Sequence, residues 1–196
     1  MNMIKNLFFL FFLLTIPSYT YSCDVQIKPS LAIGKHLKID EDNFIYFYKV
    51  GLDAAKPESF GDYGDEFEIN VMQFNCKEKK ENKIDKYGYM AVAGEIKTVF
   101  FNDADNDGKK EVFVIAAWPV NTDPVEGNVG EYYEVHVYSF YGDKLELNDT
   151  LQKYFSFGID KMKDGKLIKY PYKKAADVRE ELKSKKYKKW LLALKK

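Results

Sequence analysis

Short segments with a two-residue hydrophobic period dominate the middle of the chain. In residues 66–71, the apolar positions alternate with polar ones, which is the period of a strand with one buried face. The same alternation covers residues 133–140, and a Tyr-Gly-Asp-Lys turn at 141–144 then predicts a β-hairpin. Dense apolar or aromatic runs predict further strands at residues 44–48, 87–93, 96–101 and 112–118. The pattern therefore predicts an antiparallel-rich β-sheet.

Helical periodicity is clear only at the end of the chain. One apolar stripe with a period of 3.6 residues contains Ala175, Val178 and Leu182. A second stripe, rotated by more than about 100° on a straight helix, contains Tyr187, Trp190, Leu191 and Leu194. One straight helix cannot bury both stripes, so we expect a break near residues 184–186 or a last segment that meets a different surface. The fold class is thus predicted as α+β, with a C-terminal amphipathic helix that docks onto the sheet.

The first 22 residues have the organisation of a secretory signal. Lys5 is the only charged residue in this segment, and residues 7–16 form an unbroken apolar run that is too short for a membrane span of about twenty residues. Pro17 follows the run, and small side chains precede a cleavage point that we place after Ser22. We therefore divide the chain into a signal peptide (1–22), a β-rich domain (23–172) and a basic C-terminal helix (173–196). The expected location is the periplasm or the extracellular space.

The chain contains two cysteines, Cys23 and Cys76. In an oxidising compartment we expect them to form a disulfide, which stabilises the fold by about 3 to 4 kcal/mol in the chain-entropy estimate. Lipidation of Cys23 as the first residue after cleavage is the alternative, although Thr20 stands where lipoprotein signals usually have leucine. Lipidation would make the protein envelope-anchored.

Composition and charge limit the function. The 196 residues suffice for one domain, and 30 basic and 30 acidic residues give no net charge, which argues against a general nucleic-acid binder. Residues 173–196 contain ten basic and three acidic residues, so the rest of the chain is acidic. We interpret the basic tail as a solvated helix face on an acidic body; contact with anionic lipid or nucleic acid is the alternative. Two histidines and two cysteines exclude most His/Cys metal enzymes.

Residues 102–114 (NDADNDGKKEVFV) carry the most specific chemistry. Three aspartates, Asp103, Asp105 and Asp107, are spaced two apart, Gly108 permits a tight turn, and Glu111 stands at the ninth position from Asp103. Calcium prefers six to eight oxygen ligands, and a curled loop can direct alternate carboxylates inward. An EF-hand is excluded because its twelfth position is Val114 and the following residues are typical of a strand.

This segment resembles the calcium loop of FG-GAP or VCBS-type repeats, in which an Asp-x-Asp-x-Asp-Gly-x-x-acid stretch leads into a β-strand. A single copy in a small exported bacterial protein argues against a propeller. The resemblance implies one structural Ca²⁺ with five ligands: Asp103, Asp105, Asp107, Lys109 through its carbonyl, and Glu111. A solvated acidic turn without an ion stays open, as does a haloacid-dehalogenase-type phosphatase, whose strand also ends in Asp-x-Asp.

No catalytic signature is present in the sequence. The nucleophile elbow, the zincin helix motif and the phosphate-binding glycine loop are all absent, and nothing surrounds His36 or His136 that marks a base. Within its alternating strand, His136 is expected to be a residue of the sheet face.

Two acidic loops rich in Gly and Pro, at residues 53–66 and 119–130, are candidates for contact with a partner. In layout the chain is similar to inhibitors of cell-wall hydrolases and to immunity proteins against periplasmic toxins. That similarity implies a non-catalytic binder of a basic exported enzyme or toxin. A small secreted calcium-dependent hydrolase is the alternative function. The expected partner-binding residues are Asp62, Tyr63, Asp65, Asp123 and Glu126.

Overall fold

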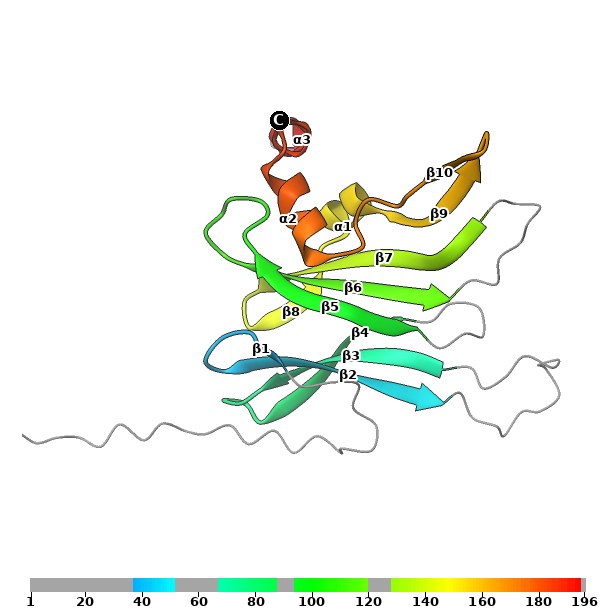
Figure 1. The fold of residues 1–196 in the computed structure, drawn as a ribbon. Coiled ribbons are helices and arrows are strands. Elements are labelled where there is room, and N and C mark those ends of the chain that lie inside the picture. The colour runs from blue at the N-terminus through cyan, green and yellow to red at the C-terminus, as the bar shows by residue number, and fades with distance from the viewer. Residues whose placement is uncertain (1–36, 52–66, 88–93, 120–127, 195–196) are drawn as a thin grey trace, which may run out of the picture.

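The computed structural model describes residues 37–51, 67–87, 94–119 and 128–194. They form three layers, with helices over a six-stranded sheet and that sheet over a four-stranded one (Figure 1). The four-stranded sheet has the order β1-β2-β3-β4, and the larger sheet has the order β10-β9-β7-β6-β5 with β8 also paired to β7. All strand pairs between the described residues are antiparallel. The predicted α+β, antiparallel-rich fold is confirmed.

The strands of each sheet are contiguous along the chain except that helix α1 separates β8 from β9. The four-stranded sheet comprises β1 (Leu37–Lys38), β2 (Asn43–Gly51), β3 (Phe67–Asn75) and β4 (Lys80–Tyr87). The six-stranded sheet comprises β5 (Glu95–Asn102), β6 (Glu111–Pro119), β7 (Asn128–Tyr141), β8 (Lys144–Leu147), β9 (Phe157–Lys163) and β10 (Lys166–Ile168). The helices are α1 (Asp149–Phe155), α2 (Ala175–Lys183) and α3 (Lys185–Leu194).

Strand β6 is the centre of the structure because both of its faces are buried. Phe113, Ile115 and Ala117 pack beneath the helices, whereas Val112, Val114 and Ala116 pack against the four-stranded sheet. A strand covered on both sides needs apolar residues at every position, which accounts for the unbroken apolar run in the sequence. The predicted strand at residues 112–118 is thus a buried central strand between two hydrophobic cores.

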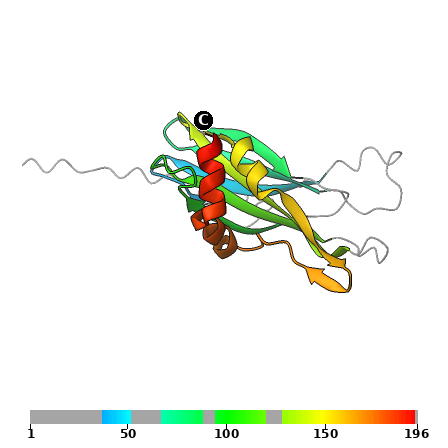
Figure 2. The ribbon, with the colours of Figure 1, turned by 90° about the horizontal axis from the view of Figure 1, so that it is seen from above.

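The C-terminal segment is broken where the two apolar stripes predicted a break. Helix α2 ends at Lys183 with Ser184 as its C-cap, and α3 begins at Lys185. Figure 2 shows the helices crossing one face of the six-stranded sheet, and the two stripes meet the same core because of the break. Leu194 is not buried with the rest of its stripe: it is 49% exposed near the end of α3.

Several elements differ from the sequence expectation. Strand β4 (Lys80–Tyr87) was not expected, and the strand predicted at residues 87–93 lies, apart from Tyr87, outside the described residues. Helix α1 and the β9-β10 hairpin were not expected. The helix is only seven residues long, and Asn148 caps it by accepting a hydrogen bond from the Leu151 N–H. Strands β9 and β10 are mostly exposed, so their residues do not alternate between buried apolar and exposed polar positions.

Cys76 directly follows β3, and its N–H donates to the carbonyl of Asp42. Cys23 lies outside the described residues, as does the whole expected signal peptide. The Cys23–Cys76 pairing therefore stays a prediction. In the part of the chain that the structure describes, no helix has the length and apolar character needed to span a bilayer.

The close approach of Gly94 to Trp118 yields a stability prediction. A Cβ at position 94 would lie 2.5 Å from Nε1 of Trp118, whose side chain is fully buried. The indole cannot yield without disturbing the core between the sheets, so Gly94→Ala should lower the free energy of unfolding by about 1 to 3 kcal/mol. Urea denaturation measures the change, with the exposed Glu146→Ala as a control expected to stay within about 0.5 kcal/mol of the wild type. Equal urea midpoints for Gly94→Ala and wild type would contradict a close approach of Gly94 to Trp118.

Candidate functional site

The acidic segment forms the turn between β5 and β6. Asn102 and Glu111 are paired where the two strands separate, and the chain between them curls over their ends. Both carboxylate oxygens of Asp103 accept backbone hydrogen bonds, Oδ1 from the N–H of Asp107 at 3.2 Å and Oδ2 from the N–H of Gly108 at 3.1 Å. Gly108 has φ +88°, a conformation that glycine adopts without strain. These bonds fix the loop in a curled form.

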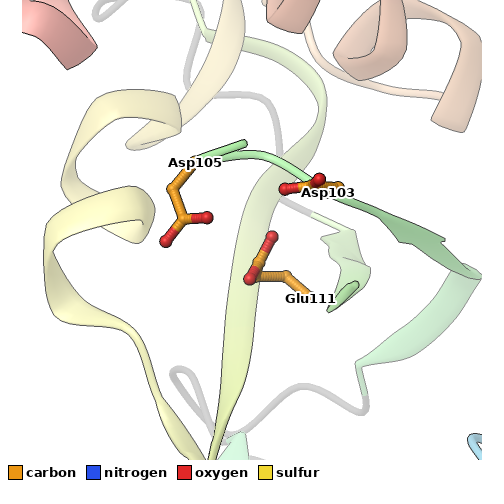
Figure 3. Close-up of side chains that lie close together, drawn as sticks. All are labelled: Asp103, Asp105 and Glu111. Carbon is orange, nitrogen blue, oxygen red and sulfur yellow. The ribbon is translucent and has the colours of Figure 1, made fainter. Parts of the chain in front are cut away.

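Three carboxylates converge inside this loop. Ligand oxygens of Asp103, Asp105 and Glu111 all lie within 4.8 Å of one another, and Figure 3 shows the three side chains directed at a common space. Asp107 is exposed and is not part of the group; its Oδ1 accepts a hydrogen bond of 2.7 Å from the N–H of Lys109. The structure thus brings together three of the five residues that the resemblance implied. The Asp107 carboxylate lies nearby but outside this group of three, and the ligand role of the Lys109 carbonyl stays a prediction.

Glu111 differs from the two aspartates because it is buried. Its side chain belongs to the first residue of β6 and the residue is 3% exposed, while Oε2 accepts a hydrogen bond of 2.7 Å from the N–H of Ala104. Burial raises the pKa of Glu111 to about 7, and the nearby carboxylates of Asp105 and Asp107 add to the rise. A buried carboxylate beside two others is electrostatically unfavourable when ionised, unless a cation compensates the charge.

The C-terminal helix α3 is tied to the same loop. Tyr187 is 1% exposed, and its hydroxyl donates a hydrogen bond of 3.0 Å to the carbonyl of Ala104. Ala104 therefore links Glu111 to Tyr187, because its N–H donates to the Glu111 carboxylate and its carbonyl accepts from the Tyr187 hydroxyl. Burial raises the pKa of Tyr187, and the carboxylates of the loop raise it further. The position of the acidic loop and the docking of α3 are thereby coupled.

The donor set fits a hard divalent cation. It consists only of carboxylate oxygens, which calcium prefers, and it contains neither sulfur nor imidazole ligands. Three carboxylates supply three or more of the six to eight oxygens that calcium takes, and backbone carbonyls and water commonly supply the rest. The loop leads into β6, as in the repeats it resembles. The phosphatase alternative requires a parallel sheet, whereas the strand pairs between described residues are antiparallel.

A second cluster of titratable groups lies between β7 and β4, and the sequence did not reveal it. His136 is 6% exposed and stacks on the ring of Tyr87 at a centroid distance of 4.0 Å. Its Nε2 lies 2.9 Å from Oε2 of Glu134, and its Nδ1 lies 3.8 Å from Oδ2 of Asp85. The Tyr138 hydroxyl donates to the same Asp85 oxygen at 2.7 Å. The cluster joins the two sheets through polar contacts.

His136 had been expected on a sheet face, and it does lie there, but the face is covered by the second sheet. Tyr87 and Asp85 come from β4, about fifty residues earlier, so only the fold brings them to His136. The alternation of Tyr132, Glu134, His136 and Tyr138 on one face of β7 is the sequence signal that could have drawn attention to this cluster.

The five expected partner-binding residues lie outside the described part of the chain, so their placement stays untested. The strands that flank the two loops are described. Gly51 pairs with Phe67, and Pro119 pairs with Glu131, where the respective hairpins open. Figure 1 places these strand ends at one end of the two sheets, whereas the acidic turn between β5 and β6 lies at the other end. The candidate ion site and the ends of the strands that flank the two loops are therefore at opposite ends of the sheets.

Comparison with known proteins gives this chain no relative: no family model, no curated protein and no solved structure matches it.

Proposed function

We propose that this chain is an exported, non-catalytic domain that binds a protein partner and holds one structural Ca²⁺ in the turn between β5 and β6. The observation that carries the calcium part is the convergence of Asp103, Asp105 and Glu111, with Glu111 almost fully buried. Ionising this group without a cation is costly, and a cation supplies the missing charge. The ion's role is to hold the loop, and through Ala104 and Tyr187 the helix α3, against the sheet.

The binding part of the proposal rests on the acidic loops at residues 53–66 and 119–130. The described ends of the flanking strands lie at one end of the sheets, so the fold supports loops that act on the same partner. Acidic loops favour a basic partner, such as a cell-wall hydrolase or toxin, because opposite charges accelerate association. The expected contacts are Asp62, Tyr63, Asp65, Asp123 and Glu126. Export, the Cys23–Cys76 disulfide and the inhibitor or immunity role belong to the same proposal.

Inhibition of basic peptidoglycan hydrolases tests the binding function. We expect saturable inhibition of at least one basic muramidase or amidase, with an association rate that falls by about tenfold or more as salt rises from 50 to 500 mM. The double variant Asp62→Lys/Asp65→Lys should reduce the rate similarly at low salt, whereas Asp164→Lys, on the β9-β10 turn, should not. An absence of inhibition across a panel of such enzymes, or unchanged rates for the loop variant, would contradict the proposed partner.

A further inference from the structure

A cavity of about 270 Å³ lies where β7 lacks a strand partner on one side. Strand β9 pairs with β7 as far as Glu134, and β8 pairs with it from Tyr138 onward, so residues 135–137 have no strand partner at this edge, although the N–H of Asn148 donates to the carbonyl of Val137. The cavity is lined from three elements: Glu134 of β7, Gln152 of α1 and Phe157 of β9 supply the groups that matter here. None of the described residues that line it belongs to the turn between β5 and β6.

Glu134 gives the cavity a fixed negative charge. Its Oε1 accepts a hydrogen bond of 3.1 Å from the Tyr132 hydroxyl, and its Oε2 faces Nε2 of His136 at 2.9 Å. Burial opposes ionisation, but the contacts with His136 and Tyr132 outweigh it and lower the pKa of Glu134. The side chain is 27% exposed, so a ligand can reach it. The ring of His136, which lies beside the carboxylate, stacks on Tyr87.

One further acceptor at the cavity lacks a donor. Oε1 of Gln152 is buried, and no group in the described part of the chain donates to it. A buried acceptor without a partner is unfavourable, and a ligand N–H would satisfy it. Asp149 and Lys153, also at the cavity, offset each other in formal charge. The cavity is therefore suited to a ligand that is positively charged and rich in N–H donors.

An aromatic side chain borders the carboxylate. Phe157 is directly opposite Glu134 in the pairing of β7 with β9, and it is 64% exposed although it is large and apolar. Its ring centroid lies 5.6 Å from that of Tyr132. A ring beside a carboxylate favours a planar cation, which can stack on the ring while it donates hydrogen bonds to the oxygens.

We propose that this cavity binds the guanidinium group of an arginine side chain of the partner. The planar group would pair with Glu134 and stack on Phe157. Arginine fits better than lysine because its guanidinium is planar, carries five donors and is more weakly hydrated than an ammonium. This inference rests on the proposed binding of a basic protein, and it adds a recognition site formed by β7, α1 and β9.

Titration with N-acetyl-arginine amide, followed by amide resonances in millimolar Ca²⁺, tests the site without any partner protein. We expect saturable shifts confined to residues around Glu134, Gln152 and Phe157, and no saturable shift with the neutral analogue N-acetyl-citrulline amide. N-acetyl-lysine amide should bind at least about threefold more weakly. Shifts that do not saturate, or equal responses to the arginine and citrulline compounds, would overturn the proposal.

Two variants and a control locate the binding. Glu134→Gln should weaken the binding of N-acetyl-arginine amide by about tenfold or more, and Phe157→Ala should weaken it by about threefold or more. Phe157 is largely exposed, so its variant should fold even if loss of the Glu134 charge disturbs His136. Glu146→Gln, an exposed carboxylate on β8, should leave the affinity unchanged. Equal affinity in wild type and Phe157→Ala would overturn the site, and because the probe is a small molecule, that result is independent of whether a hydrolase partner is found.

Discussion

Glu111→Gln is expected to stabilise the calcium-free protein at neutral pH and to remove its response to calcium. The glutamine keeps an oxygen that can accept the Ala104 N–H, but it has no charge to bury. The pKa of Glu111 is raised from the usual 4.5 to about 7, which corresponds to a cost of up to about 3 kcal/mol for folding with this group ionised. The variant should recover much of that cost above pH 7 in chelator.

The same shift fixes the sign of the pH dependence. Because the folded protein keeps its proton on Glu111 to a higher pH than the unfolded chain does, it binds more protons between pH 4.5 and about 7. The free energy of unfolding of calcium-free wild type should therefore fall as pH rises through this window, relative to Glu111→Gln, and the difference should be constant above it. Urea denaturation in chelator at pH 5 and pH 8 measures this. If Glu111→Gln is less stable than the wild type at pH 8 in chelator, the ionised Glu111 carboxylate does not destabilise the calcium-free protein.

Tyr187→Ala is expected to have the largest effect of any substitution in the C-terminal helices. The Tyr187 ring packs edge-on against Tyr154, with 4.8 Å between the ring centroids, and it also contacts Phe155 and Trp190. Removal of the ring would leave a cavity between α3, α1 and the sheet. We expect a loss of about 3 to 5 kcal/mol in the free energy of unfolding, measured by urea denaturation.

Tyr187→Phe separates packing from the hydrogen bond to Ala104. It keeps the ring and should cost only about 1 kcal/mol in chelator. If the loop and α3 are coupled through Ala104, the same variant should also reduce the stabilisation that calcium provides. The exposed Lys188→Ala is the matched control on α3 and should change neither quantity. Full calcium stabilisation in Tyr187→Phe would show that the helix and the ion site are independent.

The two-residue and 3.6-residue patterns were sufficient for much of the fold. Residues 67–71 and 133–140 form strands because their periods match a pleated sheet, and the conflict between Leu182 and Tyr187 on one helix predicted the break at Ser184. Pattern alone could not show that β6 is covered on both faces, because a fully apolar run fits a buried helix equally well. Helix α1 escaped notice because seven residues contain too few turns to establish a period.

The candidate site was only partly accessible from sequence for a physical reason. Spacing suggested which carboxylates share a loop, but burial depends on the packing around it, and burial is what separates Glu111 from the exposed Asp107. Likewise, Asp85 and His136 meet only because β4 packs against β7 in the other sheet. Contacts of this kind join residues far apart in the chain, and no local pattern encodes them.

Thermal unfolding of residues 23–196 in millimolar Ca²⁺ and again in excess chelator tests the calcium site most directly. A ligand present at a hundredfold its dissociation constant adds about 2.7 kcal/mol, so we expect the melting temperature to rise by at least about 5 °C with calcium in wild type and to stay unchanged in Asp105→Ala. Equal melting temperatures of the wild type in calcium and chelator, or the same rise in Asp105→Ala, would contradict a calcium ion held by Asp103, Asp105 and Glu111.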